Sequence, residues 1–153
     1  MFNIYCDGAC KGNPGESGSG VIIYLDDEEI NSYYGHFDKK GTNNTAELKA
    51  FIEALKIVET INEKCIIFAD SQYCINSITT WAYKWKSNNW TKKGGIKNLE
   101  LIKTAHELYD NLKDLIEVKY VKGHSNNKGN DKADYLANKA IELKEKNFVM
   151  ENK

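Results

Sequence analysis

The chain has 153 residues, of which 41% are hydrophobic and 28% are charged, and its formal net charge is −1. These values are typical of one globular domain and exclude a polycationic chain. The N-terminus has no basic segment followed by a long apolar run, and apolar runs such as VIIYL are too short to span a bilayer. We therefore expect one domain over residues 1–153, in the cytoplasm and without membrane contact.

The cysteines and the basic residues narrow the chemistry further. No two of the four cysteines have C-x-x-C spacing, which favours free thiols over a zinc site or a disulfide framework. Apart from histidine, every basic residue is lysine, and no acidic residue occurs from Ser71 to Leu99, where five lysines fall. A nearly neutral chain thus carries one basic, acid-free segment.

Three strands are predicted near the N-terminus. Alternation in FNIYCDGAC puts Ile4 and Cys6 on one face of the first strand. Residues 11–20, KGNPGESGSG, are predicted to form a turn, and the next two strands are expected at 20–27 and 29–37. Short connections between consecutive strands favour an antiparallel meander.

Helices and strands alternate in the rest of the chain. The predicted elements are a helix at 45–59, a strand at 64–70, a helical region at 71–85, a polar segment at 86–95, a helix at 99–112, a strand at 116–121 and a helix at 130–144. Because a strand–helix–strand crossover connects parallel strands, the sheet should be mixed, with helices packed on it. The tail at about 145–153 has no clear period, and we expect it to fray.

Three acidic residues lie at unusual positions, and each has a structural alternative. Asp7 lies inside an apolar strand, where a carboxylate without a partner is costly. Glu47 follows Asn44 by three residues, so the pair could form a variant capping box. Asp70 precedes a helix and could be its N-cap.

A helical wheel selects a fourth carboxylate in the last helix. Asp134 lies at the border of the inward face, whereas Asp131 points towards solvent. Glu47 likewise aligns with the apolar residues Phe51 and Val58 of its own helix.

The joint placement of these carboxylates suggests a metal site. Ligand sites in such sheets lie beyond the carboxyl ends of neighbouring parallel strands, where Asp70 ends one strand and Asp7 lies towards the end of another. Clustered carboxylates repel one another unless a divalent cation joins them. Oxygen ligands without cysteine or a histidine cluster favour Mg²⁺ or Mn²⁺.

Four segments occur in the order and spacing of type 1 ribonuclease H, namely YCDGACKGNPG, GTNNTAEL, ADSQY and VKGHSNNKGNDKADYLA. From Phe2 to about Lys144 the chain resembles this family. The resemblance implies an α/β ribonuclease H-like fold, a five-stranded mixed β-sheet with three antiparallel strands followed by parallel strands and with helices on both faces. It also implies an endonuclease that cuts the RNA strand of an RNA–DNA hybrid duplex, and we expect the protein to be a monomer.

The resemblance also implies catalytic residues and a mechanism. The family's metal-binding carboxylates fall on Asp7, Glu47, Asp70 and Asp134, and a catalytic histidine falls on His124. The implied mechanism uses two Mg²⁺ ions roughly 4 Å apart, with Mn²⁺ as a substitute, and leaves a 5′-phosphate and a 3′-hydroxyl. His124 is suited to carry a proton or to assist product departure, and an exposed loop histidine is the alternative.

Further residues match family positions that approach the RNA strand. Small polar groups and closely approaching backbone suit recognition of 2′-hydroxyls across the minor groove. The matching positions are Gly8, Cys10, Asn13, Asn43, Asn44 and Gln72. Turn and cap roles are the alternative for the asparagines.

Aromatic and lysine side chains in the acid-free segment suit binding to a nucleic-acid backbone, and the resemblance implies that this segment binds the DNA strand. These are Lys84, Trp85, Lys86, Trp90, Lys92 and Lys93. We expect Trp81 to pack under Ile78 in the core, and the resemblance implies a DNA-phosphate pocket at Thr42 and Asn98. Because arginine reads guanine edges and lysine acts as a point charge, this surface predicts steep salt dependence with little sequence preference.

Two other functions remain as alternatives. Another carboxylate-dependent nuclease or a transposase of the same fold would lack the GNPG turn, the TNNTAEL segment and the tryptophan–lysine segment. A catalytically silent hybrid-binding module would keep the basic segment and lose a carboxylate, whereas all four carboxylates are present.

Overall fold

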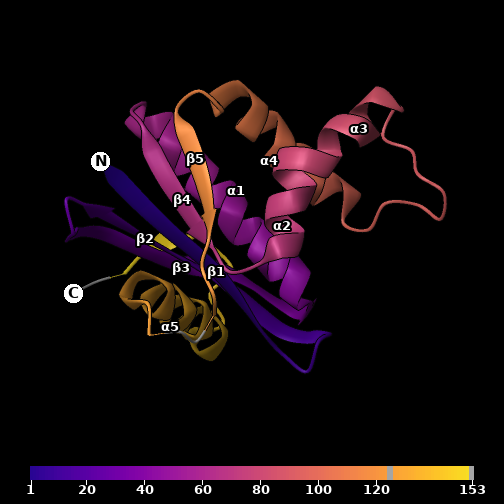
Figure 1. Cartoon of the computed structure of the whole chain (residues 1–153). Helices are drawn as coiled ribbons and strands as arrows, with labels where there is room; N and C mark the ends of the chain where they lie inside the picture. Colours follow the sequence, from indigo (N-terminus) through magenta and orange to yellow (C-terminus); the bar gives the residue numbers. More distant parts are fainter. Residues whose placement is uncertain (124–125, 152–153) are drawn as a thin grey trace.

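The structure, a computed structural model, describes residues 1–123 and 126–151 and is built on one mixed β-sheet (Figure 1). Its strands are β1 (Phe2–Lys11), β2 (Gly15–Leu25), β3 (Glu28–Gly41), β4 (Cys65–Ala69), β5 (Ile116–Tyr120) and β6 (Val149–Met150). The strand order is β5-β4-β1-β2-β3-β6. The first three strands pair antiparallel, and β4 and β5 run parallel to β1. The predicted mixed sheet is confirmed, and the two-residue strand β6 joins the five expected strands.

Helices cover both faces of the sheet, as expected (Figure 1). On one face, α1 (Asn43–Ile61) packs on β1 and β2, and α4 (Leu99–Leu112) packs on α1. On the other face lies α5 (Lys128–Leu143). A third helical region projects to the right in Figure 1 and consists of α2 (Gln72–Asn76), the π-helical segment η1 (Ser77–Trp81) and α3 (Ala82–Ser87). No helix in the described part of the chain is long and apolar enough to cross a membrane.

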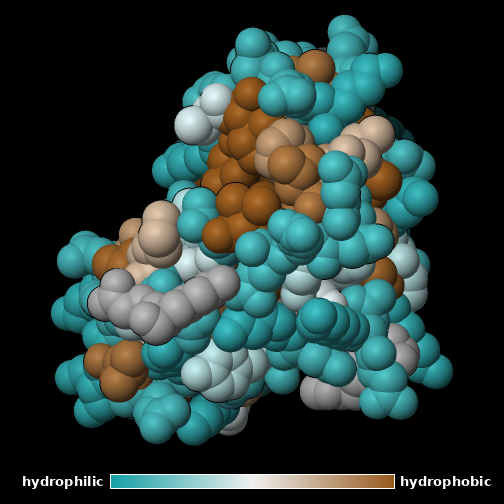
Figure 2. Space-filling model, turned by 90° about the vertical axis from the view of Figure 1, so that its left-hand side faces the viewer, coloured by the Kyte–Doolittle hydropathy of each residue, from teal (hydrophilic) through white to brown (hydrophobic). Residues whose placement is uncertain are grey.

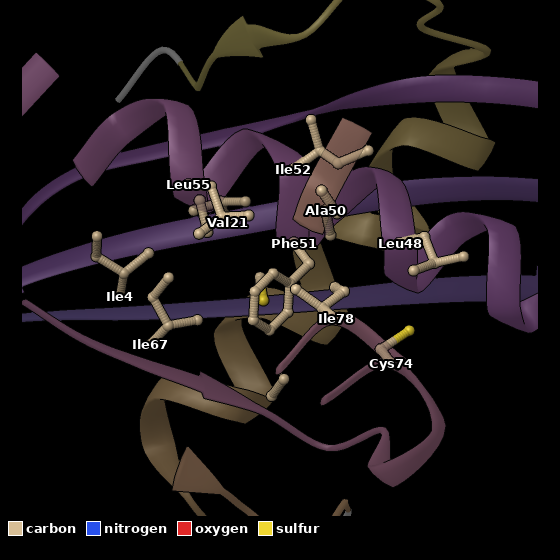
Figure 3. Packing of buried hydrophobic residues seen from close by; sticks show 14 of the residues in the cluster. Ile4, Val21, Leu48, Ala50, Phe51, Ile52, Leu55, Ile67, Cys74 and Ile78 are labelled. Atoms are coloured by element: carbon tan, nitrogen blue, oxygen red, sulfur yellow. The ribbon is translucent and has the colours of Figure 1, made fainter. Parts of the chain in front are cut away.

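The main core lies between the sheet and α1 (Figure 3). Phe51 and Leu55 of α1 pack with Ile4 of β1 and Ile67 of β4, and all four side chains are fully buried. This packing follows from the helical spacing of the apolar residues in α1, whose one stripe faces the alternating inward side chains of the strands.

The glycine-rich segment expected to be a turn is mostly strand. Only residues 12–14 connect β1 to β2, so the predicted turn is wrong for Lys11 and for residues 15–20. A Cβ atom at Gly18 would lie 2.6 Å from the carbonyl oxygen of Ala137, and one at Gly20 would lie 2.5 Å from that of Ala133. Because neither glycine has a Cβ atom, the backbone of α5 can pack directly against β2. Sequence composition alone does not distinguish glycines with this role from glycines in a turn.

The tail for which we expected fraying packs on the sheet up to residue 151. Strand β6 pairs with β3, and the Glu151 carboxylate accepts hydrogen bonds at 3.0 Å from Ser32, Lys132 and Lys139. Burial alone would raise the pKa of Glu151, but these hydrogen bonds lower it to about 2.

A hydrophobic surface lies away from the projecting helical region. Figure 2 shows the left-hand side of the molecule, where apolar side chains gather in the upper half and the lower half is mostly hydrophilic. The region of α2 and α3 lies at the right in Figure 1, on the opposite side of the molecule.

Candidate metal centre and nucleic-acid interface

Two of the predicted carboxylates meet because of strand register. The parallel pairing of β1 with β4 ends at Cys6 and Ala69, so the next residues on the two strands are Asp7 and Asp70. Strand β1 continues beyond this point to pair with β2, whereas β4 ends and the chain turns away into α2. The expected edge of the parallel strands is therefore where these side chains lie.

The capping alternatives for Glu47 and Asp70 are both wrong. Thr42 is the N-cap of α1, and its hydroxyl accepts from the Thr45 amide at 3.0 Å while the Thr45 hydroxyl accepts from the Thr42 amide at 2.9 Å. Ser71 caps α2 by accepting from the Cys74 amide at 3.2 Å. Because threonine and serine satisfy the helix starts, both carboxylates remain available for other contacts.

The carboxylates of Asp7, Glu47 and Asp70 converge, and one oxygen of each lies within 4.8 Å of the others. The Gly8 amide donates to both Asp7 Oδ1 and Glu47 Oε1 at 2.9 Å. A Cβ atom at Gly8 would lie 2.4 Å from the Glu47 nitrogen, so glycine is what lets α1 approach β1 here. These three carboxylates, the triad, thus come from β1, from α1 and from the residue that follows β4.

The electrostatics of the triad favour a bound cation. Burial, together with the charges of Asp70 and Asp134, raises the pKa of Asp7 to about 7. Burial, the hydrogen bond with Asp7 and the negative charges of Asp7 and Asp70 raise the pKa of Glu47 well above its usual value. A divalent cation would remove this repulsion, and an all-oxygen donor set fits Mg²⁺ or Mn²⁺.

A pocket of about 260 Å³ surrounds the triad. Asp134 is half-buried in its wall, and its carboxylate accepts from the Asn138 amide group at 3.3 Å. Asn130 also lines the pocket, and its buried Oδ1 has no hydrogen-bond partner among residues 1–123 and 126–151. An acceptor left open beside three carboxylates fits a hydrated cation, whose water molecules donate hydrogen bonds. His124 lies outside the described residues.

The residues expected near RNA lie around this pocket or on the neighbouring turn. Asn43 and Asn44 are exposed in the pocket wall, and Gln72 is exposed at the start of α2. Asn13 Oδ1 accepts from the Asn43 amide at 2.9 Å, so its side chain joins the β1–β2 turn to α1. The half-buried Cys10 thiol donates to the Gly41 carbonyl at 3.5 Å.

The lysine-rich segment forms a groove with the helix before it. A hollow of about 690 Å³ lies between η1, α3 and residues 92–97. The four predicted lysines of this segment are exposed, at positions Lys84, Lys86, Lys92 and Lys93. Trp85 and Trp90 are half-buried, and Lys92 Nζ lies 5.8 Å from the centre of the Trp85 ring. Aromatic rings that lie beside lysine side chains are typical of surfaces that bind nucleic-acid strands, and this groove has that arrangement.

The expectation that Trp81 belongs to the core is wrong. Its side chain is 43% exposed on the groove, 6.1 Å from the Trp85 ring, whereas Ile78 is fully buried. The segment η1 is π-helical, and a wider turn alters the spacing on which the prediction was based.

Comparison with known proteins gives the family. A family model described as RNase H matches residues 1–142. A protein named ribonuclease H from Dichelobacter nodosus is 44% identical over 153 residues, which covers 93% of both chains. The chain belongs to the ribonuclease H family. Another relative with this name, from Francisella tularensis subsp. novicida, is 44% identical over 90% of this chain and 88% of its own.

Solved structures of the family have the same fold. LC9-RNase H1, a type 1 RNase H, is similar with a TM-score of 0.82 at 24% identity, over 99% of this chain and 77% of its own. LC11-RNase H1, solved in complex with an RNA/DNA hybrid, has a TM-score of 0.71 at 21% identity, over 94% of this chain and 99% of its own.

The two residues expected at a DNA phosphate begin neighbouring helices. Thr42 caps α1, as described above, and Asn98 precedes α4 with a left-handed backbone at φ 59°. Asn98 Nδ2 donates to the Tyr73 hydroxyl at 3.2 Å and makes no side-chain cap of its own helix. Asn98 is thus positioned by the helix that follows Asp70.

Sequence reasoning missed three residues that line the carboxylate pocket, Ser71, Asn130 and Asp131. Asn130 precedes Asp134 by four residues, and this spacing on one helix was a signal that could have found it. Asp131 is exposed, as expected, but reaches the rim of the pocket.

Proposed function

We propose that the protein is an endonuclease that hydrolyses the RNA strand of RNA–DNA hybrids and leaves 5′-phosphate and 3′-hydroxyl ends. The observation that supports this most strongly is the convergence of Asp7, Glu47 and Asp70 within 4.8 Å, from three elements far apart in the chain. Membership of the ribonuclease H family supports the same activity.

Four carboxylates would hold the metal, with Asp134 added to the triad from α5, and we propose two Mg²⁺ ions, for which Mn²⁺ can substitute. Held by these carboxylates, the cations would supply positive charge at the scissile phosphate, for activation of water and stabilisation of the leaving oxygen. The protein contributes an acidic pocket in which the Gly8 amide donates hydrogen bonds to two of the carboxylates. The raised pKa of Asp7, about 7, means that this carboxyl group gives up its proton when a cation binds near neutral pH.

We assign proton transfer to His124 from its chemistry. An imidazole changes its protonation near neutral pH, so it can take a proton from water or give one to a departing oxygen. In the sequence it falls between β5 and α5, the helix that carries Asp134.

We propose that the hybrid spans two surfaces. The RNA strand lies at the carboxylate pocket, with Asn43, Asn44 and Gln72 near its 2′-hydroxyls. The DNA strand follows the groove at α3, where exposed lysines neutralise phosphates and Trp85 offers an aromatic face. Lysine without arginine favours recognition of shape and charge over base sequence.

We also propose that the protein acts as a monomer in the cytoplasm. All the carboxylates come from one chain, and the four cysteines are free thiols, which suits a reducing compartment. Sedimentation at working concentrations should give the mass of a single chain, 17.4 kDa.

A cleavage assay with a labelled RNA–DNA hybrid tests the function. RNA–RNA and DNA–DNA duplexes serve as substrate controls, and each reaction is run with Mg²⁺ and with EDTA. We expect cleavage of the RNA strand of the hybrid alone, and only with the cation. Cleavage that persists in EDTA, or equal cleavage of all three duplexes, would contradict the proposal.

A further inference from the structure

The helical region that carries the groove contains one irregular turn. In an α-helix the Ala82 amide would donate to the carbonyl of Ile78, four residues earlier. It donates to the carbonyl of Ser77 instead, five residues earlier, which is the π-helical pattern. The carbonyl of Ile78 therefore does not receive the Ala82 amide.

A buried histidine supplies a donor at this carbonyl. His106 of α4 is fully buried, and its Nδ1 lies 2.7 Å from the Ile78 oxygen. Since a carbonyl oxygen can only accept, Nδ1 carries the proton of this hydrogen bond. The other ring nitrogen, Nε2, is buried and has no hydrogen-bond partner within residues 1–123 and 126–151, so in the described structure the ring's side-chain hydrogen bond is the one to Ile78.

The same imidazole contacts both ends of α3. The Tyr83 ring, in the first turn of α3, stands perpendicular to it with the ring centres 4.4 Å apart. The Trp90 ring, beyond the end of α3, lies edge-on with the centres 6.0 Å apart. One side chain of α4 thus touches the chain before, within and after the helix that carries Lys84 and Trp85.

The π-helical turn decides which way α3 faces. One extra residue in a helix turns everything that follows by about 100° relative to a regular α-helix. Gln72 lies before the turn, beside the carboxylates, and Lys84 and Trp85 lie after it. The relative direction of these two surfaces therefore depends on whether the turn is kept.

We propose that His106 is a positioning residue for hybrid binding. Its Nδ1–H holds the Ile78 carbonyl, and thereby the π-helical turn, so that α3 presents Lys84 and Trp85 to the same duplex that reaches the carboxylates. This inference rests on the proposed function, because it assumes that a hybrid spans both surfaces.

The test compares His106→Asn with His106→Leu, whose side chains are close to each other in size and shape. The Asn amide nitrogen replaces Nδ1 as a donor, whereas Leu has the same shape without a donor. Thr104→Ala, on the exposed face of α4, is the control. Hybrid affinity is measured in EDTA, where no cleavage occurs, and KM and kcat are then measured with Mg²⁺. Circular dichroism checks that each variant is folded.

We expect His106→Leu to raise the Kd and KM for the hybrid about fivefold or more, with kcat within about twofold of the original chain. His106→Asn and Thr104→Ala should stay within about twofold in all three quantities. The proposal would be overturned by an unchanged Kd in His106→Leu, or by a rise in Kd in His106→Asn as large as that in His106→Leu. If His106→Leu fails to fold, the Kd of His106→Asn decides alone, and an increase in it overturns the proposal.

The readouts separate this inference from the proposed function. If the original chain binds hybrid in EDTA but does not cleave it with Mg²⁺, the proposed function fails, and the Kd values of the variants still decide the role of His106. If the original chain does not bind the hybrid, both proposals are overturned.

Discussion

Replacement of Asp7 by Asn should stabilise the metal-free protein while it abolishes cleavage. The Asp7 carboxylate is 3% exposed, and its pKa lies at about 7 against 3.8 for a free aspartate. At about 1.4 kcal/mol per pH unit, keeping this group ionised in the fold costs up to about 4 kcal/mol above neutral pH. An asparagine would retain the Oδ1 acceptor for the Gly8 amide without the charge.

The sign of the pH dependence follows from the direction of this pKa shift. Folding raises the pKa of the Asp7 carboxyl group, so its protonated form stabilises the fold. This stabilisation is fully present below the pKa of the unfolded chain, near 4, and is lost as the pH rises through the pKa of the folded chain, about 7. The advantage of Asp7→Asn should therefore be about 2–4 kcal/mol at about pH 8, a rise in Tm of about 5–12 °C, and should vanish towards about pH 4.

Thermal unfolding in EDTA at both pH values measures this difference. Asp114→Asn, at an exposed position, is the matched control and should leave Tm unchanged. Added Mg²⁺ should raise the Tm of the original chain and not that of Asp7→Asn. A variant no more stable than the original chain at the higher pH, or an advantage that does not depend on pH, would refute the reasoning.

Three further perturbations test other parts of the account. Asp70→Asn should lower kcat by about a thousandfold or more while hybrid affinity in EDTA stays within about threefold, and equal activity would overturn the catalytic assignment. Hybrid affinity should fall steeply with salt, and replacing Lys92 and Lys93 by Ala should reduce the log–log slope by about 2, so a flat response would count against the lysine surface. Gly20→Ala should destabilise the protein by about 1–3 kcal/mol in urea unfolding, because its Cβ would meet α5; an unchanged midpoint would contradict that packing.

The sequence predicted the elements of the carboxylate site because each depends on a local pattern. The all-apolar strand that ends just before Asp70 and the inward positions of Glu47 and Asp134 follow from the periods of strand and helix. The residues that cap the helices could not be predicted from the sequence, because four candidates are all acceptable caps by residue type, namely Thr42, Asn44, Asp70 and Ser71.

Features that depend on contacts between distant segments could not be predicted from local patterns. Gly18 and Gly20 belong to a strand because α5 lies on them, and their sequence reads as a turn. Trp81 is exposed at the end of a π-helical turn, and the Ile78 carbonyl in that turn accepts a hydrogen bond from His106, 28 residues further along the chain. In both cases tertiary packing decides between structures that are equally compatible with the local sequence.

Calorimetric titration of Mg²⁺ into the original chain and into Asp70→Asn tests the central claim most directly, that three converging carboxylates form a site for a divalent cation. The account predicts saturable binding to the original chain, which Asp70→Asn weakens about tenfold or more. Equal Mg²⁺ affinity in the two proteins, or no binding to the original chain, would contradict it.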